Sequence, residues 1–268
     1  MRHLLLLSTL LLVTFSIRSD LSTKTPYEAI RGDVRNVPRL PDAEPQQIWF
    51  LARHGARHFG GKLDALMNDF LNKLYVALDD QTWTLNENMT WFRDWNRPQY
   101  VNDKELVNEG MLEHYYIAKR YKAAFPELFP AYYPSDYEVR ATFKQRTVQS
   151  AYSFMYGLTD EGTGPLAEGS TRVNVSTTGY LPSGIQIESN NQDILLRYFD
   201  NCPVYEEYYQ LELGKKQMDL FKHTEAYLYP VLDMSKLFGM ELTVNDVEAL
   251  FYLCAYEQVI FYSVRGCF

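Results

Sequence analysis

The sequence predicts an α/β fold with an α-helical insertion lobe. Two short strand-like segments, at 47–52 and 137–142, alternate with helical patterns, and helical patterns alone follow Ile194. The 268 residues are 46% hydrophobic and 22% charged, an ordinary globular composition that can bury a sizeable core. We therefore expect one large domain, or a domain carrying an inserted lobe.

The first 19 residues are typical of a secretory signal peptide. Arg2 and His3 form a basic start, Leu4–Phe15 is apolar, and Ser19 offers a small residue for cleavage. A buried helix or a membrane anchor is the alternative, but the run is too short to span a bilayer. We expect entry into the secretory pathway, with the mature chain secreted, in the ER lumen or at the cell surface, and with no transmembrane span.

Two sequons and the cysteines bear on the same compartment. Asn88 and Asn174 begin Asn-x-Thr and Asn-x-Ser sequences, which predicts glycosylation at both. Cys202, Cys254 and Cys267 lack the spacing of metal ligands, so no metal site is predicted. Their odd number leaves at least one thiol without a partner in the chain.

The segment before the first motif changes from extended to strand-like. Residues 20–45 contain four prolines and are predicted to be an extended lead-in. The apolar run at 47–52 predicts a strand buried on both faces, and it ends in Arg53-His54-Gly55. Open α/β sheets bind ligands at the carboxyl ends of their strands, so a site is expected there.

The middle of the chain alternates between helix and strand. Apolar spacing predicts helices at 63–78, at Asn108–Phe125 with Pro126 beyond its end, and at Arg146–Leu158. The alternating segment Tyr137–Thr142 predicts a second strand. These elements assign residues 20–160 to the N-terminal part of the α/β domain.

The last hundred residues are predicted to be mainly helical. Residues 159–192 are rich in Gly, Ser and Thr and favour a long surface loop. Helical patterns follow from Ile194, and Thr243 begins a helix as its cap. We expect residues 161–268 to form the helical insertion lobe.

The charge balance excludes one class of partner. The net charge is −8 and the pI about 5.2, which argues against nucleic-acid binding because that requires a basic surface. An anionic substrate would have to be attracted by a local group of arginines.

Arg53-His54-Gly55-Ala56-Arg57 has the residue types that phosphate chemistry requires. A neutral imidazole can attack phosphorus, and arginine forks can hold the charged oxygens of the transition state. Gly55 would let the backbone turn sharply and bring main-chain N–H groups to the phosphate. Chance basic residues on a loop are the alternative, and the apolar strand before them favours a site.

The same residues resemble the histidine phosphatase superfamily, in its branch of acid phosphatases and phytases. Arg-His-Gly-x-Arg after an apolar strand is the motif of that group. Further segments are similar to multiple inositol polyphosphate phosphatases, in order and over nearly the whole mature chain: Ser22–Tyr27, Ala118–Tyr121, Phe125–Phe129, Arg146–Ala151, Arg197–Cys202 and Val244–Val247.

The resemblance implies a phosphoglycerate-mutase-like sheet flanked by helices, and it implies roles for residues. His54 would be the phosphorylated nucleophile, and Arg53, Arg57 and Arg146 would bind phosphate without any metal or cofactor. Arg146 could instead be a solvated residue at a helix start, although the helix dipole disfavours a cation there unless an anion is bound. Lys144 could add charge to the pocket or be solvated.

The chain also departs from the family pattern. His58-Phe59 follows the second motif arginine, where the family usually has an aromatic residue and a proline. The family's proton donor lies in a later His-Ala-Glu or His-Asp motif, and the sequence stops at Phe268 before that region. His223-Thr224-Glu225 follows a polar helical segment, which favours a solvated helix face over a donor.

We therefore expect a chain truncated before the C-terminal α/β half, with those strands missing and little or no turnover. Disulfides of the family would need partners downstream, although Cys254 and Cys267 could pair locally.

The resemblance implies hydrolysis of phosphomonoesters of inositol polyphosphates, phytate included, or of 2,3-bisphosphoglycerate, through a phosphohistidine. One alternative is a catalytically impaired isoform that binds phosphate or a partner, and another is a broad-specificity acid phosphatase. A phosphoglycerate-mutase-like enzyme is disfavoured, because that branch usually has Glu where Ala56 stands.

Overall fold

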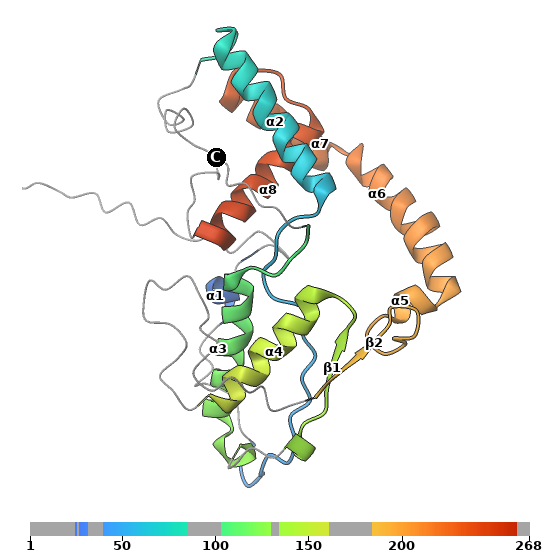
Figure 1. The fold of residues 1–268 in the computed structure, drawn as a ribbon. Coiled ribbons are helices and arrows are strands. Elements are labelled where there is room, and N and C mark those ends of the chain that lie inside the picture. The colour runs from blue at the N-terminus through green and yellow to red at the C-terminus, as the bar shows by residue number, and fades with distance from the viewer. Residues whose placement is uncertain are drawn as a thin grey trace, which may run out of the picture.

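The computed structural model describes residues 25, 27–31, 40–84, 103–129, 134–160 and 184–261. The predicted signal peptide, Asn88, Asn174 and Cys267 lie outside these residues. Within them the fold is mixed α/β, mostly helical with a small parallel sheet (Figure 1). Its elements, in chain order, are α1 (Tyr27–Ile30), α2 (Gly61–Asp79), α3 (Asn108–Ala124), η4 (Pro126–Leu128), η5 (Pro134–Asp136), β1 (Val139–Thr142), α4 (Gln145–Thr159), β2 (Ile185–Glu188), α5 (Tyr198–Asn201), η6 (Tyr205–Gly214), α6 (Lys215–Lys222), α7 (Glu225–Phe238) and α8 (Val244–Phe261).

Helices α3 and α4 pack side by side and carry β1 and β2 along one side of α4 (Figure 1). Their contact is close because small residues lie in it: a Cβ on Gly157 would approach the carbonyl oxygen of Tyr115 to 2.3 Å. Ala118, Met155 and Leu158 are buried between them. Both helices confirm the predictions made from apolar spacing, to within two residues at either end.

A second group of helices consists of α2, α7 and α8 (Figure 1). Met67 and Leu74 of α2 are fully buried against residues of α7 and α8, and the Trp83 indole N–H donates to the carbonyl of Phe238 at 2.6 Å. The predicted helix at 63–78 is thus confirmed as α2. It packs with helices that follow residue 224, so distant parts of the sequence share this core.

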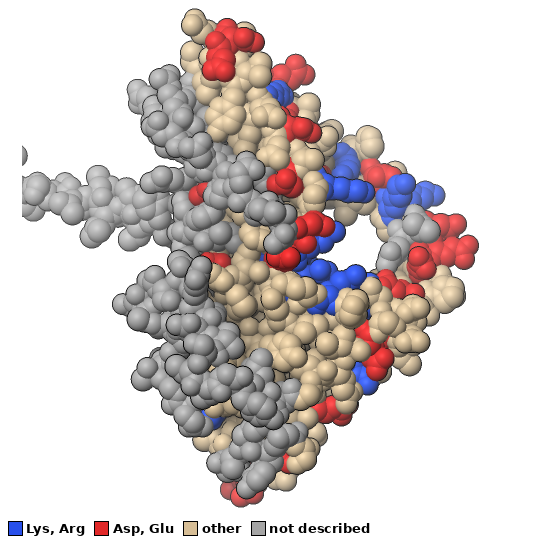
Figure 2. Space-filling model, viewed as in Figure 1, with Lys and Arg blue, Asp and Glu red and all other residues tan. Residues whose placement is uncertain are grey.

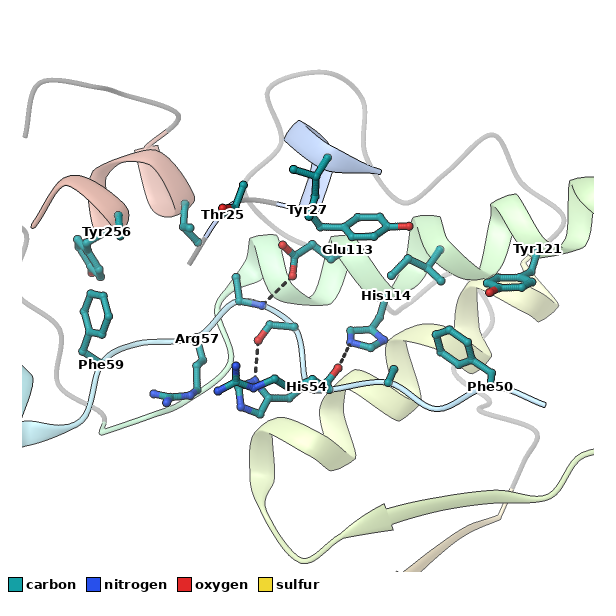
Figure 3. A pocket seen from close by; sticks show the side chains of 18 residues that line it. Thr25, Tyr27, Phe50, His54, Arg57, Phe59, Glu113, His114, Tyr121 and Tyr256 are labelled. Carbon is teal, nitrogen blue, oxygen red and sulfur yellow. Dashed lines mark hydrogen bonds between the residues drawn. The ribbon is translucent and has the colours of Figure 1, made fainter. Parts of the chain in front are cut away.

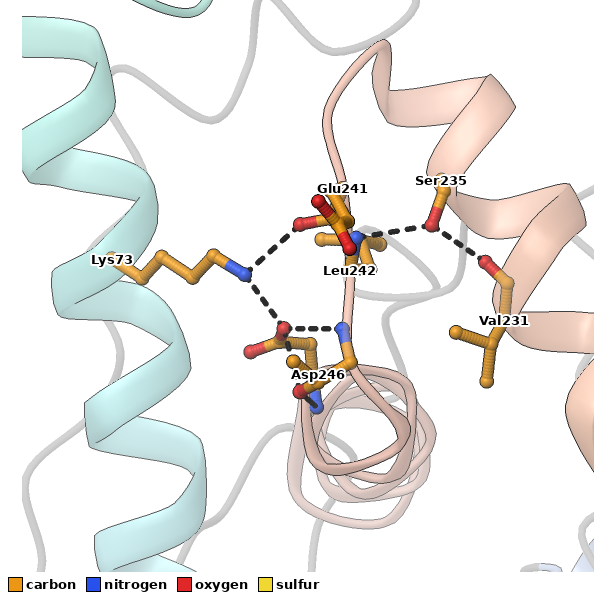
Figure 4. Close-up of polar contacts among 7 residues, drawn as sticks. Lys73, Val231, Ser235, Glu241, Leu242 and Asp246 are labelled. Carbon is orange, nitrogen blue, oxygen red and sulfur yellow. Dashed lines mark hydrogen bonds and ion pairs between the residues drawn. The ribbon is translucent and has the colours of Figure 1, made fainter. Parts of the chain in front are cut away.

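The start of α8 confirms the predicted cap (Figure 4). The Asp246 N–H donates to Thr243 Oγ1 at 3.2 Å, and the Thr243 N–H donates back to Asp246 Oδ2 at 2.7 Å, a reciprocal capping arrangement. Lys73 Nζ on α2 lies 2.7 Å from the same carboxylate oxygen and donates to the carbonyl of Glu241 at 3.1 Å. The cap therefore also joins α2 to α8.

The described sheet has only two strands, and one of them, β2, was not predicted. Strand β1 confirms the segment at 137–142, and it pairs in parallel with β2, Val139 opposite Ile185. The prediction of a surface loop over 159–192 is wrong at β2. An alternation of only four residues, Ile-Gln-Ile-Glu, is too short to stand out in a stretch rich in turn-forming residues.

The predicted buried strand at 47–52 is also wrong. This segment has no strand pairing, and Trp49 and Leu51 are exposed to 83% and 64%, while Ile48 is only half-buried. In the described ranges β1 and β2 pair only with each other, so no neighbouring strand is available to form a ladder with residues 47–52. The Phe50 ring stacks on Phe154 at 4.8 Å and meets Tyr121 edge-on at 5.4 Å, so this residue ties the segment to α3 and α4.

Helices α5, η6 and α6 form an arm that extends from the sheet towards α7 (Figure 1). This confirms the helical patterns predicted after Ile194. Among the helices described, none is both long and apolar enough to cross a bilayer.

Candidate active site

The motif at 53–57 passes between α3 and α4 as irregular backbone (Figure 3). It approaches α3 very closely: a Cβ on Gly55 would lie 2.2 Å from the carbonyl oxygen of Gly110, and one on Gly110 would lie 2.2 Å from that of Ala56. Such distances exclude any side chain at either position. Gly55 is therefore required for the contact with α3.

Three side chains hold the backbone of the motif. The Gly55 N–H donates to Ser150 Oγ of α4 at 3.0 Å, and the Ala56 N–H donates to Glu113 Oε2 of α3 at 2.7 Å. His114 Nε2 donates to the carbonyl of Arg53 at 3.0 Å. The expectation that these main-chain N–H groups face the phosphate is wrong for Gly55 and Ala56, because protein oxygens already accept from both.

The geometry around His54 fixes which ring nitrogen is free. Nδ1 lies 2.8 Å from the carbonyl oxygen of Gly55, and a carbonyl can only accept, so Nδ1 carries the proton. The lone pair that could attack phosphorus is then on Nε2. Burial, with the charges of Arg146, Arg53 and Arg57, outweighs the hydrogen bond to Gly55 and lowers the pKa of His54 to about 4.

The structure brings Arg53, Arg57 and Arg146 close enough to His54 for the charge of each to lower the pKa of its ring. All three charges act on His54, and burial followed by the charges of its arginine neighbours lowers the pKa of both Arg57 and Arg146. Arg57 Nη1 donates to the carbonyl of His58 at 2.6 Å, whereas the buried Nε of Arg146 has no hydrogen-bond partner in the described structure. An unmet donor among converging cations suits a bound anion.

Two further charged residues belong to this group and were missed from the sequence. After burial, the charge of Arg197 is the largest influence lowering the pKa of Arg146, and Arg197 itself pairs with Asp200. The carboxylate of Asp103 raises the pKa of both Arg57 and Arg146 and accepts the Gly61 N–H at 2.9 Å. Arg197 lies within one of the segments that resemble the phosphatases, but nothing in the sequence singles out Asp103.

Lys144 and His223 do not contribute to the pKa shifts of His54, Arg57 and Arg146 in the described structure, and phosphate binding by Lys144 stays a prediction. Lys144 is the N-cap of α4, and its charge is not among the influences on His54, Arg57 or Arg146. His223 is exposed at the end of α6, where its ring contacts the carbonyl of Asp219 at 2.6 Å, in agreement with the predicted solvated face.

A cavity of about 550 Å³ lies along the motif. Residues 52–57 line it together with side chains of three helices: Tyr27 of α1, Glu113, His114, Ile117 and Tyr121 of α3, and Tyr256 of α8. The side chains of His54 and Arg57 lie on the α4 side of the motif backbone, whereas Glu113 and His114 lie on the α3 side (Figure 3). Neither of these two residues therefore faces a leaving group bound opposite His54 Nε2.

The surface charge agrees with this geometry. Lys and Arg side chains gather at the edge of the hollow between the body and the α5–α6 arm, although the whole chain is acidic (Figure 2). A local basic group of this kind attracts anions within about one Debye length, roughly 8 Å at physiological salt.

The cysteines differ in their state, and the described side chains form no metal-binding group. Cys254 is disulfide-bonded and Cys202 has a free, exposed thiol, while the predicted partner Cys267 lies outside the described residues. No group of three or more His, Cys, Asp or Glu side chains in the described part of the chain could hold a metal ion.

The known proteins to which this chain is similar are named phosphatases, in agreement with a site suited to phosphate. The chain is similar to a thiamine-repressible acid phosphatase of Schizosaccharomyces pombe, 25% identical over 92% of this chain and 52% of the relative. It is also similar to proteins named multiple inositol polyphosphate phosphatase 1. The one from Drosophila melanogaster is 25% identical over 88% of this chain and 50% of its own length, and the one from Dictyostelium discoideum 30% over 78% and 32%.

The chain thus spans about half the length of the first two relatives, and less of the third. The family model of the histidine phosphatase superfamily, branch 2, matches residues 46–267, from just before the motif almost to the last residue. This chain belongs to the histidine phosphatase superfamily, branch 2.

Proposed function

We propose that this chain supplies the phosphate-binding and phosphoryl-accepting part of a phosphomonoesterase. The observation that carries the proposal is a neutral His54 with a fixed tautomer, surrounded by Arg53, Arg57 and Arg146. A neutral imidazole is the nucleophilic form, and three guanidinium groups match the charge that spreads over three equatorial oxygens.

The reaction would proceed in two displacements at phosphorus. The lone pair on His54 Nε2 forms an N–P bond while the ester P–O bond breaks and its electron pair leaves with the alcohol oxygen. The hydrogen bond from Nδ1–H to the Gly55 carbonyl holds the ring in line during the attack. Water then cleaves the N–P bond and releases inorganic phosphate.

The leaving oxygen needs a proton, and this determines how much turnover to expect. Glu113 and His114 line the cavity but lie on the other side of the motif from His54, so neither is placed to protonate a leaving group opposite Nε2 (Figure 3). General acid assistance contributes about 10²–10⁴-fold, so its loss slows each turnover by that factor. We therefore propose phosphate binding and slow phosphoryl transfer by these residues.

Phosphomonoesters of inositol polyphosphates, phytate included, are the proposed substrates, and 2,3-bisphosphoglycerate is a further candidate. Two relatives are named for inositol polyphosphates, and a substrate with several phosphates suits a group that adds Arg197 to the three arginines. The S. pombe relative, matched over 92% of this chain, favours a broad-specificity acid phosphatase as the second candidate. Entry into the secretory pathway, glycosylation at Asn88 and Asn174, and the division at residue 160 remain part of the proposal.

Residues 20–268, purified from a secretory host, test the proposal with inositol hexakisphosphate and with p-nitrophenyl phosphate. Binding of orthovanadate and a trace of acid-labile phosphoprotein are expected, both lost in His54→Asn, with little phosphate released. Robust release that His54→Ala abolishes would contradict slow turnover and still support His54. Absence of both vanadate binding and phosphoprotein would refute the proposed function, and vanadate binding without phosphoprotein would favour a chain that only binds anions.

A further inference from the structure

Ser150 connects the nucleophile loop to the helix that carries Arg146. Its hydroxyl accepts the Gly55 N–H at 3.0 Å and donates to the carbonyl of Arg146 at 2.7 Å. The residue is only 3% exposed and lies one helical turn after Arg146. One buried hydroxyl therefore links two elements that are 95 residues apart in sequence.

Among the described residues, neither strand of the sheet pairs with the segment that leads into the motif, so side-chain links to the motif matter more. Residues 47–52 make no strand pairs, and the motif itself has a single bridge, from Arg57 to Leu106. Glu113 and His114 fix the loop from the α3 side, and Ser150 fixes it from the α4 side. Only the contact from α4 involves the helix on which Arg146 is placed.

Ser150 is connected through backbone groups to both the His54 ring and Arg146. The N–H that Ser150 accepts belongs to the peptide between His54 and Gly55, and the carbonyl of Gly55 accepts His54 Nδ1–H. The same hydroxyl donates to the peptide carbonyl of Arg146. A shift of the loop relative to α4 would therefore change the separation of the imidazole and the guanidinium.

We propose that Ser150 is a positioning residue that sets the distance between His54 and Arg146, and so the affinity of the site for a phosphoryl group. The inference rests on the proposed function of these two residues. Removing the hydroxyl leaves the buried Gly55 N–H without its acceptor and removes the constraint between loop and helix. We expect phosphate affinity to fall about tenfold in Ser150→Ala, which corresponds to about 1.4 kcal/mol of binding free energy.

A purely structural serine would behave differently, and α4 provides a matched control. Ser153 Oγ donates to the carbonyl of Gln149 at 2.9 Å, the same backbone contact in the same helix, but no hydrogen bond of its hydroxyl to the motif is found. Both substitutions remove one hydrogen bond to a helix carbonyl. Only Ser150→Ala should weaken phosphate binding, and Ser150→Thr, which keeps a hydroxyl, should restore most of it.

The experiment measures the dissociation constant of inorganic phosphate by calorimetry for the mature chain and these variants, with far-UV circular dichroism as the check of folding. In an Arg146→Gln background, Ser150→Ala is expected to have little further effect, because the partner whose distance it sets has been removed. Equal affinities for wild type, Ser150→Ala and Ser153→Ala would overturn the inference, as would full additivity of the Ser150 and Arg146 changes. If Ser150→Ala does not fold, Ser150→Cys takes its place, with a loss of affinity supporting the inference and none contradicting it.

Two results of this experiment distinguish the proposed function of His54 from the role of Ser150. Wild-type chain that binds no phosphate at millimolar concentration, as His54→Asn is expected to behave, refutes the proposed function and the inference with it. Wild-type chain that binds phosphate while Ser150→Ala binds equally well refutes only the role of Ser150.

Discussion

The neutral state of His54 in acid can be tested by titrating its ring directly and by removing Arg146. Burial is the largest cause that lowers the pKa of His54 to about 4, and the charge of Arg146 is the largest contribution from a neighbouring side chain. We expect Arg146→Gln to raise this pKa without restoring it to 6.5, because the burial remains.

The size of the effect follows from the two pKa values. At pH 5 a histidine with a pKa of about 4 is about 90% neutral, whereas one with the ordinary value of 6.5 is about 3% neutral. The structure therefore implies about thirty times more nucleophile at this pH than an unperturbed histidine would provide.

The assay is an NMR titration of selectively labelled histidines from pH 7.5 to 3.5. The chain has five histidines, and His54→Asn identifies the resonance of interest by its loss. His58 provides an internal control, since burial lowers its pKa and Glu105 raises it, with no contribution from Arg146. Its titration should stay in place when Arg146 is changed. A His54 midpoint at or above 6.5 in the wild-type chain would refute the reasoning.

The same shift predicts a loss of stability in acid. The folded pKa of His54 is below the unfolded value, so the unfolded chain binds more protons between about pH 6.5 and 4, and the free energy of unfolding falls as the pH falls through that window. The shift corresponds to about 3 kcal/mol at most, which we reduce to about 1–2 kcal/mol because the ring is partly exposed. Urea unfolding at pH 7 and pH 4.5 should show this difference in the wild-type chain and a smaller one in His54→Asn.

Three predictions concern stability and are checked by urea unfolding. Gly110→Ala should cost about 2–3 kcal/mol, because its Cβ would lie 2.2 Å from the Ala56 carbonyl, while Gly61→Ala, with nothing within 4 Å, should not destabilise the chain. Leu51→Lys should change stability by less than about 0.5 kcal/mol, since Leu51 is 64% exposed, and a cost of several kcal/mol would show that the segment is a buried strand after all. Burial raises the pKa of Asp246, but Lys73 and Thr243 outweigh it and hold that pKa below its usual value. Lys73→Met should therefore lower the free energy of unfolding by about 1–2 kcal/mol at pH 7 and by less at pH 3, where Asp246 is partly protonated. An equal loss at both pH values would contradict the ion pair.

The helices of this chain could be predicted because their information is local. Met67, Phe70 and Leu74 recur at helical spacing in α2, and all three are buried. The conformation of residues 47–52 could not be predicted in the same way. An apolar run favours a strand, but it does not say whether another strand is present to pair with it. The run instead leaves Trp49 and Leu51 on the surface.

Some residues of the candidate site could also be predicted from local sequence, and others could not. His54 and the arginines of the motif follow from residue types that are adjacent in sequence, and Arg146 follows only from the resemblance to a family. Glu113 and His114 look like ordinary polar residues of an amphipathic helix. Their partners are backbone groups of the motif, 57 and 61 residues earlier, and no local pattern indicates such pairs.

These side-chain contacts explain how the motif can be ordered without strand pairing. Each hydrogen bond contributes only about 1 kcal/mol, yet Ser150, Glu113 and His114 reach the loop from two helices and restrict it on both sides. The close contact of Gly55 with Gly110 adds a steric limit. Helices α3 and α4 pack tightly against each other, and the segment before α3 adds the Arg57–Leu106 bridge and the hydrogen bond from the Val107 N–H to the Ala56 carbonyl at 3.1 Å. Under the proposed function, phosphate binding would depend on the α3–α4 pair, so substitutions in this pair should change phosphate affinity first.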